Sequence, residues 1–212
     1  MKDSIFLPKK SVLFDLDGVL LDSRPNMKHA WEDVRSQLDI AVDFEEYFKN
    51  IGRPFKDILE ILGLRDRVDE IVSVYNRSSK ENFHLATYYP GVVETLQKLE
   101  LNGIKLGIVT SKDTERTDIV LSRLPVKFVA VQTPNSQFRG KPAPDHLLLA
   151  MAQTNVDPKE SIFIGDAEVD RKAAFRAGMD YCHASWGYGE PECKGVTVLK
   201  DINHLLTFLR ID

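Results

Sequence analysis

The chain repeats one local pattern, in which a short apolar run rich in β-branched residues is followed by a longer segment with helical periodicity. Nearly continuous apolar runs are typical of strands covered by helices on both faces, and their alternation with helices indicates βα units. We therefore predict an α/β core with a doubly wound, Rossmann-like parallel sheet. The predicted strands cover residues 11–16, 104–109, 127–131 and 161–165, with weaker candidates at 180–184 and 196–199.

The segments between these strands predict helices over residues 91–102, 114–124, 142–154 and 168–177. Pro142 and Asp166 mark the starts of the last two, and Gly178 ends the final one. The helical module that interrupts the alternation carries the apolar stripes Trp31, Val34 and Leu38, then Phe55, Ile58, Leu59 and Leu62, then Val68, Ile71, Val72 and Tyr75. We predict a core domain of residues 1–22 and 90–212, with an inserted all-helical cap domain of residues 23–89.

Composition argues against several classes of protein. The 28 Lys and Arg residues against 32 Asp and Glu leave a formal charge of -4, without the basic surplus of nucleic-acid-binding proteins. No apolar run approaches the roughly 18 residues of a membrane span, and the run at residues 5–7 is too short for a signal peptide. We expect a cytoplasmic protein with no nucleic-acid or membrane partner, in which Cys182 and Cys193 are unpaired reduced thiols.

The first predicted strand ends in two aspartates, in the segment Phe14-Asp15-Leu16-Asp17-Gly18. Side chains two residues apart on an extended segment point to the same side, and open parallel sheets bind ligands at the carboxyl ends of their strands. Because paired carboxylates repel each other, they need a cation or hydrogen-bond donors nearby. The segment is therefore either a functional site or a turn that favours Asp and Gly.

Three later segments place polar side chains at the same kind of position. Thr110 and Ser111 follow the second predicted strand, where they are suited to hold an anion or to cap the next helix. Lys141 precedes a predicted helix and is suited to neutralise a phosphate, unless it is a solvated surface lysine. Asp166 and Asp170 follow the fourth predicted strand, where they either favour the positive end of the next helix or repeat the aspartate-ended strand of the first segment as part of a site.

In this order, the acid pair, hydroxyl, lysine and second acid pair resemble the four motifs of the haloacid dehalogenase-like hydrolase superfamily. The resemblance extends over essentially the whole chain, through the segments FDLDGVL, YPGV, IVTSK, GKPAPD, IGDAEVD and ASWGYG. The pattern is most similar to the phosphoglycolate phosphatase-like and β-phosphoglucomutase-like members, which carry a helical cap in this position. The resemblance implies a Mg²⁺-dependent enzyme acting on a small phosphorylated metabolite.

The same resemblance implies a role for each motif residue. Asp15 would be the nucleophile that forms an aspartyl-phosphate, and Asp17 would be the general acid/base. Mg²⁺ would be held by the carboxylates of Asp15 and Asp166 and by the backbone carbonyl of Asp17, with Asp170 as a ligand or as a partner of a ligand. The remaining phosphate oxygens would be bound by Thr110, the backbone of Ser111 and Lys141.

Substrate choice is expected to lie mainly in the cap. Its segment 50–56 resembles the part of related caps that faces the active site, so Arg53 and Lys56 are candidate contacts to a second anionic or hydroxylated part of the substrate. The other interpretation is two solvated charges beside an amphipathic helix. Trp186 and Tyr188 are predicted to lie in a loop near the site, although packing of an aromatic loop explains them equally well.

We predict a phosphatase, with a phosphomutase of the β-phosphoglucomutase type as the alternative, because both share the four motifs. A 2-haloacid dehalogenase needs neither Mg²⁺ nor a second aspartate in the first motif, so Asp17 argues against it. A non-catalytic binding protein would be expected to have lost Asp15, Lys141 or Asp166, and all three are present. The cap is expected to move as a lid about hinges near residues 21–24 and 88–91.

Overall fold

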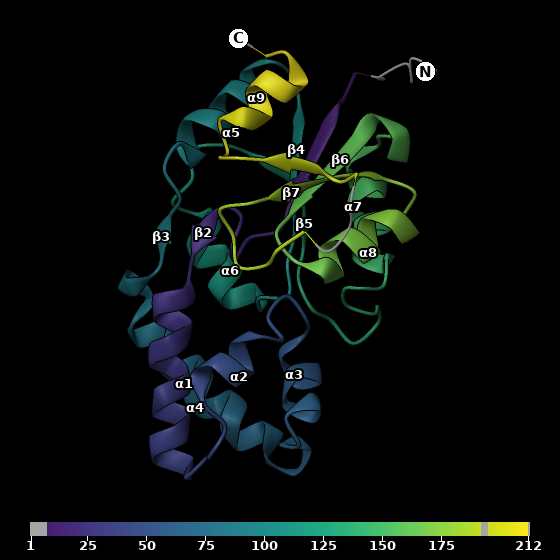
Figure 1. Cartoon of the computed structure of the whole chain (residues 1–212). Coiled ribbons are helices and arrows are strands. Elements are labelled where there is room, and N and C mark those ends of the chain that lie inside the picture. Colours follow the sequence, from purple (N-terminus) through teal and green to yellow (C-terminus); the bar gives the residue numbers. More distant parts are fainter. Residues whose placement is uncertain (1–7, 192–194, 212) are drawn as a thin grey trace.

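The structure is a computed structural model that describes residues 8–191 and 195–211. The apolar run at residues 5–7 and Cys193 lie outside these described residues, whereas Cys182 is buried. Within the described ranges, six strands form one parallel sheet in the order β5-β4-β1-β6-β7-β8 (Figure 1). Its strands are β1 Ser11–Phe14, β4 Lys105–Val109, β5 Phe128–Gln132, β6 Ser161–Gly165, β7 Asp180–Ala184 and β8 Thr197–Leu199. Because β4 and β6 lie on opposite sides of β1, the sheet is doubly wound, as predicted.

Helices cover both faces of the sheet, and the side chains of β1 alternate between them. Val12 and Phe14 pack into an apolar cluster with residues of α5, α6 and α9, whereas Leu13 packs with residues of α7 and α8. This arrangement explains why the central strands β1 and β6 are buried along their whole length, since both of their faces are covered. The helices are α5 Val92–Leu101, α6 Thr114–Leu121, α7 Asp145–Thr154, α8 Glu168–Arg176 and α9 His204–Leu209.

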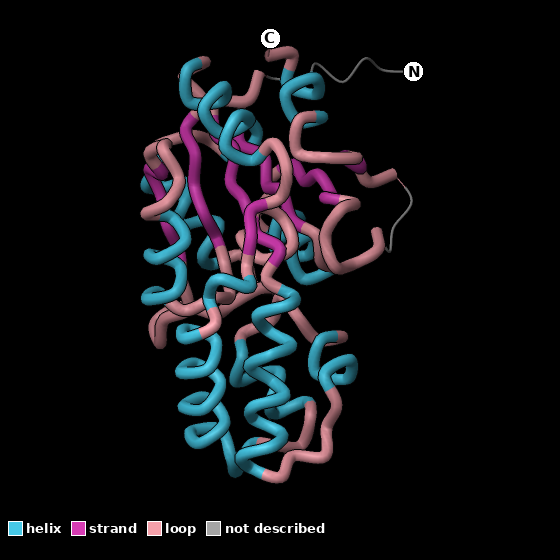
Figure 2. Tube along the Cα trace, turned by 90° about the vertical axis from the view of Figure 1, so that its left-hand side faces the viewer, coloured by secondary structure: helices cyan, strands magenta, loops and turns pink. Residues whose placement is uncertain are grey.

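A helical segment lies at one end of this sheet and has an apolar cluster of its own (Figures 1 and 2). The predicted stripes form α1 Arg24–Leu38, α3 Phe55–Ile61 and α4 Val68–Glu81, and a further short helix, α2 Phe44–Phe48, lies between the first two. The chain enters through β2 Leu21–Asp22 and returns through β3 Thr87–Tyr88, which pair antiparallel. Along the described chain, no helix combines the length and apolar character that crossing a membrane requires.

Several predicted element starts and ends differ from those of the structure, and two of the differences have clear local reasons. Strand β1 ends at Phe14 because the Leu16 carbonyl accepts hydrogen bonds from the N–H groups of Val19, Leu20 and Leu21, which turns the chain back. Helix α7 begins at Asp145 and not at Pro142. Two prolines lie ahead of it, and a residue before proline is disfavoured in the helical region.

The residue that caps the start of α8 also differs from the prediction. Helix α8 begins at Glu168, as predicted, but its N-cap residue is Ala167 and not Asp166, and Asp170 accepts the N–H of Ala167 at 3.0 Å. Asp166 therefore lies outside the helix, in the turn between β6 and α8. Its carboxylate is free to face the end of the sheet.

We expect Trp31→Ala to lower the free energy of unfolding by about 3–5 kcal/mol, because a large buried side chain is replaced by a cavity. Trp31 is fully buried, stacks on Tyr47 with 4.4 Å between ring centroids, and donates from Nε1 to the Val42 carbonyl at 3.0 Å. Urea denaturation measures the loss. The control is Leu101→Ala, at a side chain that is 85% exposed, where a change within about 0.5 kcal/mol is expected. Equal losses in the two variants would contradict the packing argument.

Candidate active site

The carboxyl ends of three adjacent strands bring the predicted motif residues together. Asp15 follows β1, Thr110 follows β4 and Asp166 follows β6, and β1 lies between the other two strands. Lys141 reaches the same place from a turn that follows β5 and precedes α7. Residues that are up to 151 positions apart in sequence therefore surround one point at the edge of the sheet.

Three buried aspartates form a carboxylate cluster at this point. Asp15, Asp166 and Asp170 each offer one oxygen, and these oxygens lie within 4.8 Å of one another. The ammonium of Lys141 lies 2.7 Å from Asp15 Oδ2 and 2.7 Å from Asp170 Oδ1. Lys141 is 3% exposed, so it is not a solvated surface lysine. We refer to these four residues as the carboxylate cluster and its lysine.

Burial governs the protonation of the carboxylate cluster. It raises the pKa of Asp15 to about 7, with Asp170 adding to the shift against the attraction of Lys141. It raises the pKa of Asp166 well above the ordinary value, to which Asp170 and Asp15 also contribute. Burial opposes the charge of Lys141, but the two carboxylates beside it outweigh burial and raise its pKa. Three carboxyl groups against one ammonium make an oxygen-rich, negatively biased donor set that fits a hard divalent cation.

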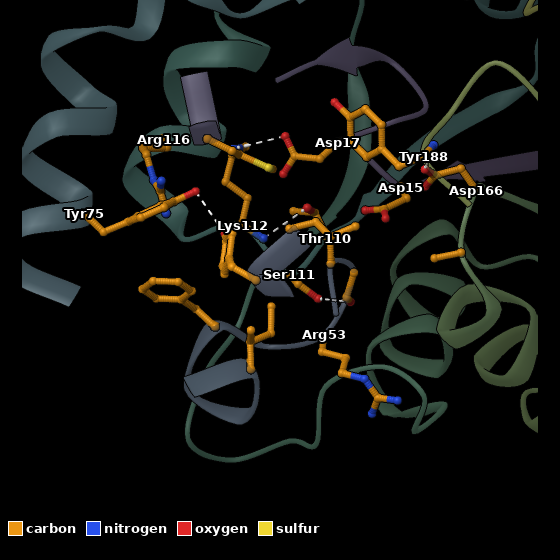
Figure 3. A pocket seen from close by; sticks show the side chains of 17 residues that line it. Asp15, Asp17, Arg53, Tyr75, Thr110, Ser111, Lys112, Arg116, Asp166 and Tyr188 are labelled. Atoms are coloured by element: carbon orange, nitrogen blue, oxygen red, sulfur yellow. Dashed lines mark hydrogen bonds and ion pairs between the residues drawn. The ribbon is translucent and has the colours of Figure 1, made fainter. Parts of the chain in front are cut away.

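Asp17 has a different environment from the other aspartates. Its Oδ1 accepts a hydrogen bond from Ser23 Oγ at 2.6 Å. The same oxygen lies 3.1 Å from the ammonium of Lys112 (Figure 3). Lys112 is buried, and burial lowers its pKa against the attraction of Asp17. Lys112 is not among the site residues predicted from the sequence, although it directly follows Ser111 in the second motif.

Thr110 and Ser111 are not helix caps, because Asp113 is the N-cap residue of α6. Thr110 is buried and its Oγ1 accepts the N–H of Lys112 at 3.2 Å. The hydroxyl of Ser111 donates to the carbonyl of Gly52 in the helical segment at 2.7 Å. The Thr110 side chain therefore holds the loop in shape, and the Ser111 side chain contacts the helical segment. The contact that was predicted between Ser111 and an anion uses its backbone N–H and not its side chain.

The helical segment closes over these residues and leaves a cavity of about 50 Å³. Arg116 and Tyr75 line it, and neither was predicted from the sequence. The guanidinium of Arg116 pairs with Asp113, donates to Ser79 Oγ at 2.9 Å, and lies 5.4 Å from the ring centroid of Tyr75. Arg116 lies in the first turn of α6, and its closeness in sequence to the second motif was the available signal.

The two residues that were predicted to contact the substrate, Arg53 and Lys56, lie in different places. Arg53 lines the 50 Å³ cavity, but its guanidinium points away from the aspartates (Figure 3). Lys56 is exposed and lines a neighbouring groove of about 640 Å³ that also reaches Ser111 and Lys141. The structure thus places Lys56 outside the cavity that contains Asp15.

The loop after β7 lies against the site, as predicted. Trp186 Nε1 donates to the carbonyl of Val19 at 3.0 Å, and Tyr188 N donates to Asp166 Oδ2 at 2.7 Å. A Cβ atom on Gly187 would lie 2.3 Å from Asp166 Cβ and 2.5 Å from the carbonyl oxygen of Gly18. Only glycine permits this approach, because a larger residue would displace the Asp166 carboxylate.

Residues 12–184 match the profile of a family described as haloacid dehalogenase-like hydrolase. The chain belongs to this family. It is 31% identical to a phosphoglycolate phosphatase of Aquifex aeolicus, over 84% of this chain and 85% of that one. It is 26% identical to a pyrophosphatase PpaX of Oceanobacillus iheyensis, over 94% and 89% of the two chains. These names confirm the expected enzyme class, a haloacid dehalogenase-like phosphatase.

Solved structures agree with the fold. A protein from Lactobacillus plantarum, provisionally named a phosphoglycolate phosphatase, superimposes with a TM-score of 0.87 at 22% identity and covers 95% of this chain and 99% of its own. A protein from Bacteroides vulgatus, provisionally named a beta-phosphoglucomutase, has a TM-score of 0.76 at 26% identity, with 95% and 89% covered. The shared fold includes the helical segment, since nearly the whole chain superimposes.

We expect Lys141→Met to lower the free energy of unfolding by about 3–5 kcal/mol near pH 8, because Asp15 and Asp170 then repel each other without their cation. In the native protein, the pKa of Asp15 lies at about 7, above its ordinary 3.8. Its contribution to stability is therefore full below pH 3.8 and lost as the pH rises through about 7. Without Lys141, which lowers this pKa, the Asp15 carboxyl group stays protonated to still higher pH, so the deficit should shrink between about pH 8 and pH 5.

Urea denaturation of both proteins at both pH values measures this deficit. The matched control is Lys172→Met on α8, whose ammonium makes an exposed contact to Glu168. We expect this control to change stability by less than about 0.5 kcal/mol. If Lys141→Met loses the same free energy of unfolding at both pH values, repulsion between two carboxylates is not the cause of the loss.

Proposed function

We propose that this chain is a Mg²⁺-dependent phosphatase that hydrolyses a small phosphorylated metabolite through an aspartyl-phosphate on Asp15. The observation that carries the proposal is the setting of Asp15. Its carboxylate is buried, contacts Lys141 at 2.7 Å, and lies in the carboxylate cluster with Asp166 and Asp170. A nucleophile in this position has a cation for the transferred phosphoryl group and ligands for a metal beside it.

The first step forms the covalent intermediate. An oxygen of Asp15 attacks phosphorus, the bond from phosphorus to the ester oxygen breaks, and Asp17 transfers its proton to the leaving oxygen. In the second step Asp17 takes a proton from water, the water oxygen attacks phosphorus, and the bond to Asp15 breaks to release phosphate. The separate environment of Asp17, beside Ser23 and Lys112, supports a division of labour between the two aspartates.

The phosphoryl oxygens would be bound by Thr110, the backbone N–H of Ser111 and the ammonium of Lys141. Asp15 and Asp166, with the backbone carbonyl of Asp17, would hold Mg²⁺, and Asp170 would be a ligand or a partner of a ligand. The metal supplies positive charge that offsets the charge of the phosphoryl group beside these carboxylates. When phosphate occupies the site, Lys141 is expected to exchange part of its contact with Asp15 for a phosphate oxygen.

Residues 23–89 would act as a cap domain that opens and closes over the core formed by residues 1–22 and 90–212. The cavity of about 50 Å³ has room for a few water molecules or one small anion, so a whole substrate requires the cap to move. The paired strands β2 and β3 join the two parts of the chain and are placed to serve as the hinge. Arg53 and Lys56 remain candidates for contacts to the substrate as the cap moves.

The alternative is a phosphomutase, which would return the phosphoryl group to a sugar instead of water. The neighbour from Bacteroides vulgatus is the observation that favours it. Against it, the named relatives are a phosphoglycolate phosphatase and a pyrophosphatase, and the YPGV, IVTSK and WGYG segments are similar to the former group. We therefore favour hydrolysis of a small phosphorylated metabolite in the cytoplasm.

We expect chelation of divalent metal to abolish turnover and added Mg²⁺ to restore it, because three carboxylates otherwise repel an anionic substrate. Binding to the native state also raises the melting temperature. At a Mg²⁺ concentration of about 100 times its Kd, the gain is about 2.7 kcal/mol, or roughly 5–10 °C. Phosphate release and thermal denaturation measure the two effects. The control Asp166→Asn should lose most of the thermal shift, and an unchanged shift in that variant would place the metal elsewhere.

We expect Asp15→Asn to remove turnover with little loss of stability, because the amide keeps the volume of the carboxylate but is not a nucleophile. Asp17→Asn should slow turnover by about 10² to 10⁴ through loss of general acid/base catalysis. Phosphate release is measured beside conversion of hexose 1-phosphate to hexose 6-phosphate. Asp69→Asn, on the exposed surface of α4, is the control and should leave activity unchanged. Isomer conversion with little free phosphate would decide for the mutase.

A further inference from the structure

Tyr188 contacts both the carboxylate cluster and the start of the helical segment. Its backbone N–H donates to Asp166 Oδ2 at 2.7 Å. Its hydroxyl oxygen accepts from the backbone N–H of Ser23 at 2.7 Å and from that of Arg24 at 3.1 Å. One residue of the core thus joins a predicted metal ligand to the point where the chain leaves the core.

The hydroxyl of Tyr188 accepts hydrogen bonds from backbone N–H groups at the start of α1. The first N–H groups of a helix have no partner within the helix, and a serine at the N-cap usually accepts one of them with its own side chain. Ser23 is the N-cap residue of α1 but makes no such hydrogen bond, because its Oγ donates to Asp17 Oδ1 at 2.6 Å. Tyr188 instead accepts the N–H groups of Ser23 itself and of Arg24, the first residue of the helix, and the Ser23 hydroxyl faces Asp17.

The ring of Tyr188 holds its hydroxyl in place. It packs against Phe48 of α2 with 5.0 Å between ring centroids, and the guanidinium of Arg24 lies 4.6 Å from the same Phe48 ring. On the other side, a Cβ atom on Gly18 would lie 2.9 Å from the Tyr188 ring. The ring is therefore confined between the helical segment and the loop that carries Asp17.

We propose that Tyr188 is a positioning residue for the general acid: its hydroxyl fixes the backbone of Ser23, and Ser23 then orients the carboxylate of Asp17. This inference rests on the proposed function, because it takes Asp17 as the proton donor to the leaving oxygen. Tyr188 does not touch the reacting atoms in this account. Its removal acts through Ser23, by letting the Asp17 carboxylate turn away from the leaving group.

A misplaced general acid affects esters in proportion to the basicity of their leaving group. Phenyl phosphate and p-nitrophenyl phosphate have nearly the same shape, but p-nitrophenolate is a much weaker base and leaves with little need of a proton. The value of kcat/KM reports the steps up to formation of the aspartyl-phosphate, which are the steps in which Asp17 donates its proton. The ratio of the two kcat/KM values therefore measures how well the acid is positioned.

The test is Tyr188→Phe, which keeps the ring and removes the hydroxyl. We expect kcat/KM for phenyl phosphate to fall about tenfold more than kcat/KM for p-nitrophenyl phosphate, a fraction of the 10² to 10⁴ that general acid catalysis supplies. The control is Trp186→Phe, which removes a hydrogen bond to Val19 from the same loop without touching the start of α1. This control should keep the native ratio. An equal loss for both esters in Tyr188→Phe, or the same change of ratio in Trp186→Phe, would overturn the inference while leaving the phosphatase in place.

Hydrogen exchange tests the contact independently of activity. In Tyr188→Phe the amide of Ser23 should exchange about tenfold faster, since it loses its acceptor, whereas the amide of Arg24 should change less because it keeps Asp22 Oδ1 as a second acceptor at 3.3 Å. In Trp186→Phe they should exchange at the native rate. Unchanged exchange in Tyr188→Phe would overturn the inference by itself. If the native protein hydrolyses neither ester and no other phosphate ester, the proposed function fails, and the exchange rates still decide whether Tyr188 holds the start of α1.

Discussion

The arrangement at the carboxyl edge of the sheet depends on one buried ion network, in which the Lys141 ammonium lies 2.7 Å from both Asp15 and Asp170. Taking carboxylates out of water is costly, and placing three of them within 4.8 Å adds their mutual repulsion. A single ammonium offsets part of this cost. Burial, with the repulsion of the neighbouring carboxylates added to it, raises the pKa values of Asp15 and Asp166. The remaining negative bias explains why the cluster suits a divalent cation beside an anionic substrate.

The site is completed by the helical segment and not by the core alone. The contacts that join them at the site include Ser23 to Asp17, Ser111 to Gly52, and Arg116 to Ser79. These three hydrogen bonds form only while the helical segment lies against the core, whereas Asp17 and Arg116 also have partners within the core, Lys112 and Asp113. Function and packing are therefore coupled here, because the side chains that surround the reacting atoms also hold the two parts of the chain together.

Much of the fold could be predicted because its signals are local. Strands covered on both faces are apolar throughout, and helices show their own periodicity, so the order of elements is visible in the sequence. The failures are also local in cause. Strand β1 ends early because the Leu16 carbonyl closes a turn, and α7 begins late because two prolines precede it. Such details depend on which carbonyl accepts which N–H group, and residue type alone does not specify that choice.

By itself, the sequence determined the chemistry and its order along the chain: Asp15 and Asp17, Thr110 and Ser111, Lys141, then Asp166 and Asp170, each after a strand or before a helix. These residues are recognisable because each motif is a short contiguous segment. Only the tertiary structure decided their partners. Tyr188 meets Ser23 across 165 positions, and Arg116 meets Ser79 across 37, with no local pattern that relates either pair. The physical reason is that a strand end fixes where a motif lies, whereas contacts between distant segments arise from how the helical segment packs on the sheet.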